Sequence, residues 1–251
     1  MGTVLTPGPV YHARGAALAA GFPETVPIQA VNRFCSSGLM AVTVIANQIR
    51  AGQIEIGLAV GVESMSQKYV GLFSRPCRLP VLFFSNDSPD NGAPPQSESI
   101  GVNPTAKDCT YPMGWTSENV AQDFNISRDI MDTFAAQSFQ RAEHAEKSGY
   151  FAKEIVPFTV SVNDKDPATG GTSRRRVTVT KDDGIRYGTT KESLFKIRSA
   201  FPQWGQGRTT GGNASQITDG AAAVLMMTRR KAEELGLPIL SKYVSTAVAG
   251  T

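Results

Sequence analysis

The stretch VNRFCSSGLMAV, at residues 31–42, decides how this chain is interpreted. It places Cys35 directly before two serines, a glycine and a series of small and apolar residues. Residues 36–50 have the composition of a helix that is apolar on nearly every side, which predicts that this helix is buried. Cys35 is therefore expected where a short strand at residues 27–31 leads into a buried helix.

Two interpretations of Cys35 follow from this position. Backbone N–H groups at the start of a helix lack partners within the helix, and the helix dipole is positive there. Both effects stabilise a thiolate, which is the nucleophilic form of cysteine. The alternative is a small packed thiol without a chemical role, because cysteine is among the residue types most often found in protein cores. The residues around Cys35 leave both interpretations open.

The other cysteines and the histidines do not complete a nucleophilic site. A cysteine nucleophile commonly needs a histidine as its base. His144 lies among charged residues on a helix face and His12 begins an alanine-rich helix, so neither is predicted to pair with Cys35. Cys77 and Cys109 lie in a proline-rich segment and are predicted to be packing residues. An odd number of cysteines without metal-ligand spacing predicts free thiols, a reducing compartment and no metal site.

Composition excludes several classes of function. The chain has 251 residues, of which 41% are hydrophobic and 19% charged, as in ordinary globular proteins. A net charge of +3 argues against a dedicated nucleic-acid or membrane surface and suits a small anionic ligand. No Walker A sequence is present, and GLAVGVES lacks the glycine spacing of a dinucleotide-binding motif. No secretory signal is visible in the first residues.

The order of predicted elements favours an α/β fold with an inserted excursion. The pattern predicts a helix ending near Gly21 and a strand near 54–62, followed by a proline-rich segment at 67–110 with a candidate strand VLFFS at 81–85. Helices are predicted at 116–124 and 128–148, and then a hairpin of strands at 154–162 and 175–180. A helix after 189, a buried strand at 221–227 and a helix ending at Gly236 complete the predicted elements. The 128–148 helix is bounded by Ser127 as N-cap and Gly149 as its end. Thr189 and Glu192 are predicted to form a capping box. The arginine run at 174–176 is interpreted as a solvated strand edge.

Four separated motifs resemble one family. VNRFCSSGLMAV, PMGWTSENVA, GNASQITDGAAAVLMM and RRKAEELGLPIL occur in the order found in thiolases, and are most similar to the peroxisomal 3-ketoacyl-CoA thiolases. The resemblance implies an α/β, layered thiolase-like fold. Residues 1–66 and 218–238 would form its N-terminal half, without the first strand and helix, and residues 67–217 its coenzyme A-binding loop domain. Residues 239–251 would begin a C-terminal half that is otherwise missing.

The resemblance also implies a reaction. Thiolases cleave a 3-ketoacyl-CoA with coenzyme A, giving acetyl-CoA and a shortened acyl-CoA in fatty-acid β-oxidation, and Cys35 would carry the acyl intermediate. Its own N–H would be one donor to the oxyanion. Coenzyme A is then a substrate and no cofactor is expected. The complete form would be a homodimer in the peroxisome, otherwise in the cytoplasm or mitochondria, with no nucleic-acid or membrane partner.

Residues of the loop domain match coenzyme A positions of the family. Arg186 would lie beside the adenine, and Ser215 near the pantetheine. The remaining matches, which would line the nucleotide, the pantetheine or the acyl channel, are Met113, Ser193, Ala200 and Phe201. For each, ordinary packing in the loop domain is the alternative.

Several departures from the family pattern lead to a second hypothesis. The GHP-x-G histidine, the C-x-G-x-G cysteine and the NEAF segment of thiolases do not occur in these residues. The segment before GNAS is about two residues longer than usual and contains Trp204, and Phe34 stands where glutamine is common. The first hypothesis is a thiolase whose complete form is active. The second is a truncated, inactive relative that binds acyl-CoA or a full-length partner subunit.

Overall fold

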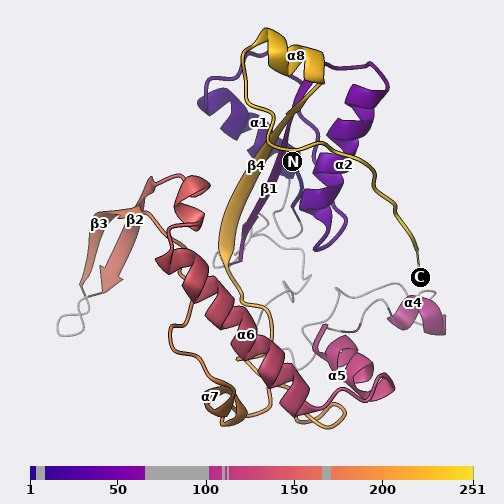
Figure 1. The fold of residues 1–251 in the computed structure, drawn as a ribbon, viewed down its shortest axis with the longest axis vertical. Coiled ribbons are helices and arrows are strands. Elements are labelled where there is room, and N and C mark those ends of the chain that lie inside the picture. Colours follow the sequence, from indigo (N-terminus) through magenta and orange to yellow (C-terminus); the bar gives the residue numbers. More distant parts are fainter. Residues whose placement is uncertain (4–8, 66–101, 109–110, 112, 166–170, 251) are drawn as a thin grey trace, which may run out of the picture. The chain divides into compact units, whose positions relative to one another are not determined.

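The computed structural model describes residues 1–3, 9–65, 102–108, 111, 113–165 and 171–250 (Figure 1). The chain divides into two compact units, Met1–Cys77 with Ile217–Thr251, and Arg78–Gln216. The described elements of the first unit are α1 (Pro9–Ala19), α2 (Ser37–Arg50), β1 (Ile56–Ser64), β4 (Asp219–Met227) and α8 (Arg229–Glu234). Those of the second unit are α4 (Pro104–Asp108), α5 (Met113–Asp123), α6 (Arg128–Lys147), the 3-10 turn η1 (Phe151–Lys153), β2 (Phe158–Lys165), β3 (Thr172–Val179) and α7 (Lys191–Phe195).

The sheet of the first unit is built on β1. β4 pairs with one edge of β1 in antiparallel register, from Ile56 opposite Met227 to Ser64 opposite Asp219. At the other edge, Gly2 forms parallel bridges with both Gly61 and Val31. The strand predicted at residues 27–31 is therefore reduced to this single bridge.

Helix α2 packs on the side of β1 that carries the small residues. A Cβ atom on Gly57 would lie 2.6 Å from Cγ2 of Ile45, and one on Gly61 would lie 3.5 Å from Cα of Gly38. Glycines on the strand let the helix approach closely, because they place no side chain between the two backbones. This contact orients the first turn of α2, which follows Cys35.

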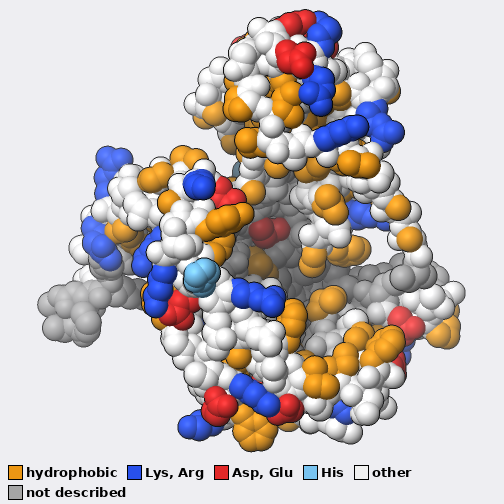
Figure 2. Space-filling model, viewed as in Figure 1, with side chains coloured by type: hydrophobic (Ala, Val, Ile, Leu, Met, Phe, Trp, Pro, Cys, Tyr) orange, Lys and Arg blue, Asp and Glu red, His pale blue; other side chains and the backbone are white. Residues whose placement is uncertain are grey.

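Two predictions of burial in this unit are wrong. Leu39 on α2 is 62% exposed, and Val224 and Leu225 on β4 are 48% and 56% exposed. Both elements have few packing partners within the described residues. Helix α2 packs mainly on β1, and β4 is paired only along its β1 edge. Figure 2 shows hydrophobic side chains at many places on the visible face of the chain, interspersed with charged ones.

Helix α6 has the boundaries that its end residues predict. The Ser127 hydroxyl accepts a hydrogen bond from the N–H of Ile130 at 3.2 Å, and Gly149 follows the helix with φ of 73°. The hairpin is also confirmed, with Phe158 of β2 opposite Val179 of β3. The arginines at 174–176 lie exposed on β3, as predicted. Helix α8 ends before Gly236, which has φ of 63°.

The predicted capping box of α7 is wrong by one residue. Thr190, rather than Thr189, is the N-cap, and its partner is Ser193 rather than Glu192. The Thr189 hydroxyl instead donates to the carbonyl of Arg186 at 2.6 Å. Because this hydrogen bond closes the preceding turn, the helix begins one residue later than the pattern suggests.

Some predictions fall on residues outside the described ranges. These are the candidate strand VLFFS and the packing roles of Cys77 and Cys109. Among the described residues, no helix combines the length and the apolar character that crossing a bilayer requires. No group of three His, Cys, Asp or Glu side chains gathers around a potential metal position in the same part of the chain.

Candidate functional site

Cys35 lies in a tight turn immediately before α2, and its thiol is free and exposed. The turn is closed by hydrogen bonds from Ser36 N to Arg33 O at 3.1 Å and from Ser37 N to Phe34 O at 3.0 Å. The side chain of Asn32 accepts from Phe34 N at 3.0 Å. These bonds lead directly into the helix, so Cys35 occupies the helix-start position that the sequence predicts.

The turn is strained at the residue before the cysteine. Phe34 has φ of 49°, in the left-handed region that bulky residues rarely adopt, and its side chain is 79% exposed. Strained backbone of this kind persists where surrounding contacts hold it, and it is frequent at functional sites. The strain therefore marks the turn that presents Cys35 as a candidate functional feature.

Ser37 is the residue that holds this turn, and sequence reasoning missed its role. Ser37 is 3% exposed. Its hydroxyl donates to Phe34 O at 2.6 Å and accepts from Arg33 N at 2.7 Å. The Ser36 side chain, in contrast, makes no cap hydrogen bond. A serine at the first helical position was the available signal, but the pattern did not distinguish Ser37 from Ser36.

The histidines lie where the sequence predicts. His12 lies in α1 and His144 in α6, and both are exposed. Within the first unit, no hydrogen bond between described side chains joins His12 to Cys35. The described residues of this unit therefore supply a thiol at a helix start without a histidine partner.

All the predicted coenzyme A residues lie in the second unit, whereas Cys35 lies in the first. Met113 and Phe201 are brought together, because the Phe201 ring covers Gly114. A Cβ atom on Gly114 would lie 2.5 Å from this ring. Met113 itself is 72% exposed and precedes this contact at the start of α5.

Ala200 and Ser215 are connected through one backbone segment. Ala200 N donates to Thr209 O at 2.9 Å, and Thr210 O accepts from Ala214 N at 3.0 Å. Ser215 follows this turn directly. The side chains of Ala200 and Ser215 are exposed, so both remain accessible to a ligand.

Arg186 and Ser193 lie beside the same segment. Gln216, next to Ser215, donates from Nε2 to Gly184 O at 2.7 Å, which brings the chain near Arg186 to the end of the turn. Helix α7, which carries Ser193, packs on Gly212: a Cβ there would lie 2.7 Å from Cδ2 of Leu194. The structure thus assembles the predicted ligand residues along connected segments of one unit.

The Arg186 turn is held by the C-terminal half of α6. Glu143 Oε2 accepts from Gly188 N at 2.9 Å, and Glu146 accepts from the hydroxyl of Tyr187. Hydrogen bonds from Lys147, first, and from the backbone of Gly188 hold the pKa of Glu143 below its ordinary value. The guanidinium of Arg186 donates to Asp183 O at 2.6 Å and is otherwise exposed.

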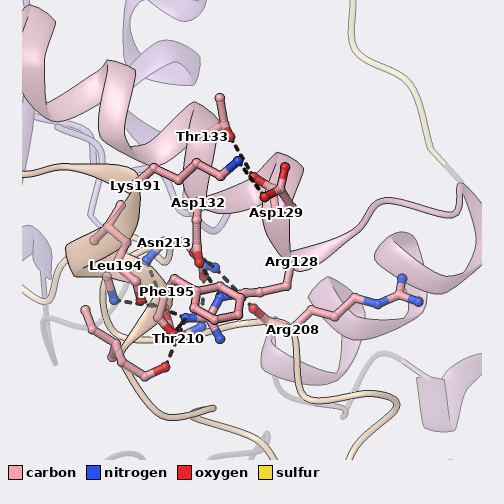
Figure 3. A network of polar contacts seen from close by, with 12 residues as sticks. Arg128, Asp129, Asp132, Thr133, Lys191, Leu194, Phe195, Arg208, Thr210 and Asn213 are labelled. Carbon is pink, nitrogen blue, oxygen red and sulfur yellow. Dashed lines mark hydrogen bonds and ion pairs between the residues drawn. The ribbon is translucent and has the colours of Figure 1, made fainter.

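A polar network joins α6, α7 and the turn before Ser215 (Figure 3). Arg128 forms an ion pair with the fully buried Asp132, with Nε and Oδ2 2.6 Å apart. Its Nη2 donates to Leu194 O at 2.8 Å, and Asp132 Oδ1 accepts from Asn213 Nδ2 at 2.9 Å. Sequence reasoning missed this network, although the i,i+4 spacing of Arg128 and Asp132 is a signal for an ion pair on a helix.

Aromatic rings pack around Phe201. Trp204 stacks on Phe201 with ring centroids 4.9 Å apart and an interplanar angle of 18°. Trp115 meets Trp204 edge-on at 5.8 Å and stacks on Tyr111 at 5.5 Å. Trp204, which departs from the family pattern, therefore lies directly against a predicted ligand residue.

Comparisons with known proteins agree with the resemblance. The model of the thiolase N-terminal domain matches residues 1–230. The chain is 48% identical over 237 residues to the peroxisomal 3-ketoacyl-CoA thiolase of Yarrowia lipolytica, covering 94% of this chain and 51% of that protein. It is 47% identical over 252 residues to the human peroxisomal 3-ketoacyl-CoA thiolase, covering 100% of this chain and 53% of that protein.

Solved structures show the same relationship. The dimeric peroxisomal thiolase of Saccharomyces cerevisiae matches with a TM-score of 0.76 and 42% identity, over 95% of this chain and 53% of that chain. Human mitochondrial 3-ketoacyl-CoA thiolase in complex with CoA matches with a TM-score of 0.67 and 28% identity, over 93% of this chain and 53% of that chain. The chain therefore spans about half the length of these relatives, and the predicted fold class is confirmed. On the family match and these identities, this chain belongs to the thiolase family, of which it carries the N-terminal domain.

Proposed function

We propose that this chain supplies the nucleophile and the coenzyme A site of an acyltransferase that cleaves 3-ketoacyl-CoA. The observation that carries the proposal is the exposed thiol of Cys35 on the strained turn before α2, within the motif that matches the family. The thiolate is the form of cysteine that attacks a carbonyl.

The proposed reaction has two steps. In the first, the Cys35 thiolate adds to the 3-keto carbon, the bond between C2 and C3 breaks, and acetyl-CoA leaves after its C2 takes a proton. The acyl group then remains on the sulfur as a thioester. In the second, the thiol of free coenzyme A gives up its proton, attacks this thioester and releases the shortened acyl-CoA, which restores the cysteine. The N–H of Cys35 is proposed as one donor to the thioester oxyanion.

The coenzyme A residues support the same proposal. We propose Arg186 as the contact for the adenine, Ser215 as the contact for the pantetheine, and Met113, Ser193, Ala200 and Phe201 as contacts for the rest of the ligand. The support is their assembly along connected segments of one unit and the exposure of most of their side chains. An exposed guanidinium next to an ordered turn suits an anionic nucleotide.

Intact-mass spectrometry after incubation with an acyl-CoA tests this function. We expect the wild-type chain to gain the mass of one acyl group and the Cys35→Ala variant to gain none, with peptide mapping placing the adduct on Cys35. Binding of acyl-CoA without any adduct would favour the inactive, ligand-binding relative instead. If the wild-type chain shows no adduct and no binding of acyl-CoA, the proposal is overturned.

Assembly and location are proposed from the relatives. A homodimer is proposed because the Saccharomyces cerevisiae relative is described as dimeric. Light scattering after gel filtration tests this, since a dimer has twice the 26.8 kDa of the single chain. A peroxisomal location is proposed because the Yarrowia lipolytica and human relatives are peroxisomal, and fluorescence microscopy of the tagged full-length protein tests it.

A further inference from the structure

Glu118 is a buried carboxylate that the proposed reaction does not use. It lies on α5 and is only 2% exposed. Its Oε1 accepts from Thr209 N at 2.7 Å and its Oε2 accepts from Arg208 N at 3.1 Å. Among the residues that the structure describes, no Lys or Arg forms an ion pair with it. The carboxylate therefore binds two consecutive backbone N–H groups that lie far from it in sequence.

This geometry requires a group that accepts hydrogen bonds at both atoms. An ionised carboxylate has two acceptor oxygens and no donor, so it satisfies both N–H groups at once. A glutamine amide has one acceptor and one donor, and its NH₂ would face a backbone N–H. The site therefore distinguishes Glu from Gln, although the two side chains have the same shape.

The segment that Glu118 binds connects directly to ligand residues. Thr209 O accepts from Ala200 N at 2.9 Å, which sets the backbone of Ala200 and the adjacent Phe201. On the other side, the fully buried Thr210 accepts from Gly212 N and Asn213 N, both at 3.2 Å, in the turn that precedes Ser215.

A second contact holds the same segment against α5. Arg208 is 9% exposed, and its guanidinium donates to Ile126 O at 2.9 Å and to the carbonyl of Ala121. A cation near the C-terminal end of α5 is also favoured by the helix dipole. Glu118 and Arg208 thus both tie the backbone at 208–209 to α5 and to the residues that follow it, through contacts that are buried or partly buried.

We propose that Glu118 is a positioning residue for coenzyme A: its carboxylate fixes the backbone of Arg208 and Thr209, and this backbone orients Ala200, Phe201 and Ser215. The proposal rests on the proposed coenzyme A site. Glu118 itself is buried and does not touch the ligand. Apart from the bond of Gln216 to Gly184, the turn of Arg186 is held by contacts that do not involve the backbone at 208–209, with Asp183 and with Glu143. Glu118 therefore acts on the pantetheine side of the site and not on the adenine side.

Calorimetric titration of the 251-residue chain with two ligands tests this. Coenzyme A reports the whole site, and adenosine 3′,5′-bisphosphate reports the nucleotide side alone. For Glu118→Gln we expect the Kd of coenzyme A to rise about tenfold, as for loss of one hydrogen bond to a charged group, and the Kd of the bisphosphate to stay unchanged. Glu154→Gln, an exposed glutamate of the same unit, is the control and should change neither value.

The outcomes separate this inference from the proposed function. A wild-type chain that binds neither ligand would overturn the proposed coenzyme A site, and the inference with it. Wild-type binding that Glu118→Gln leaves unchanged, or equal weakening of both ligands, would overturn the positioning role alone. If circular dichroism shows that Glu118→Gln does not fold, Glu118→Asp, which keeps an acceptor-only group, carries the same comparison and should weaken only coenzyme A.

Discussion

The ring of Phe201 lies against Gly114 so closely that a Cβ atom on Gly114 would be 2.5 Å from two ring carbons. Only glycine leaves room for the ring at this position. Trp204 stacks on the same Phe201 ring. The start of α5 and a predicted ligand residue are therefore joined by one aromatic packing unit.

Replacing Gly114 by alanine should destabilise the second unit. The added methyl group must displace the Phe201 ring, and overpacking of this kind costs about 1–3 kcal/mol. Urea denaturation followed by tryptophan fluorescence measures the loss, because Trp115 and Trp204 lie in the same cluster. Gly211→Ala is the matched control, since nothing lies within 4 Å of a Cβ there. Equal stability of the two variants would contradict the packing argument.

Replacing Phe34 by glycine should stabilise the first unit slightly. A side chain in the left-handed region costs about 1–2 kcal/mol, and the greater flexibility of unfolded glycine offsets part of the relief. We expect a net gain of about 0.5–1 kcal/mol in the free energy of unfolding by urea. Phe22→Gly, at a residue without positive φ, should lose stability instead. A loss in both variants would show that Phe34 is not strained.

Replacing Thr190 by alanine should weaken the start of α7. The variant loses the N-cap acceptor of Ser193 N, which costs about 1 kcal/mol. Glu192→Ala should cost less, because the exposed Glu192 is not the partner in the capping box. Thermal unfolding monitored by circular dichroism compares the stability of the two variants. A larger loss of stability for Glu192→Ala would support the capping box predicted from the sequence instead.

The same cap affects how Ser193 is tested as a ligand residue. Ser193→Ala removes a hydrogen bond of the capping box as well as a predicted coenzyme A contact. We expect Ser193→Ala to weaken coenzyme A binding more than Thr190→Ala does, in calorimetric titrations of both variants. Equal weakening would mean that Ser193 acts only through the helix start.

Glu143 should make stability depend on pH in the acid range. Its pKa is below the ordinary 4.5 in the folded chain, so its contribution is present above about pH 4.5 and is lost as the pH falls through the folded value. Glu143→Gln should therefore lower the Tm at pH 7 and lower it less at pH 3. Glu154→Gln serves as the control. A difference that grows towards acid pH would have the wrong sign for this carboxylate.

The sequence by itself determined the elements whose signals are local. Ser127 and Gly149 predicted the bounds of α6, because a cap residue and a glycine act within one turn of the helix end. The alternation of residues in β1 and the hairpin strands was equally local. Cys35 at a helix start followed from the same kind of pattern, and the family followed from four motifs in order.

The tertiary structure alone decided which contacts hold the candidate site. The bonds from Glu118 to Arg208 and Thr209 join residues about ninety positions apart, and no local pattern encodes that pairing. The same holds for Asp132 with Asn213. The N-cap of α7 is Thr190 rather than the predicted Thr189, because the Thr189 hydroxyl donates to the carbonyl of Arg186 in the preceding turn. Backbone propensity acts over a few residues, whereas a buried polar group must find its partner wherever the chain brings one.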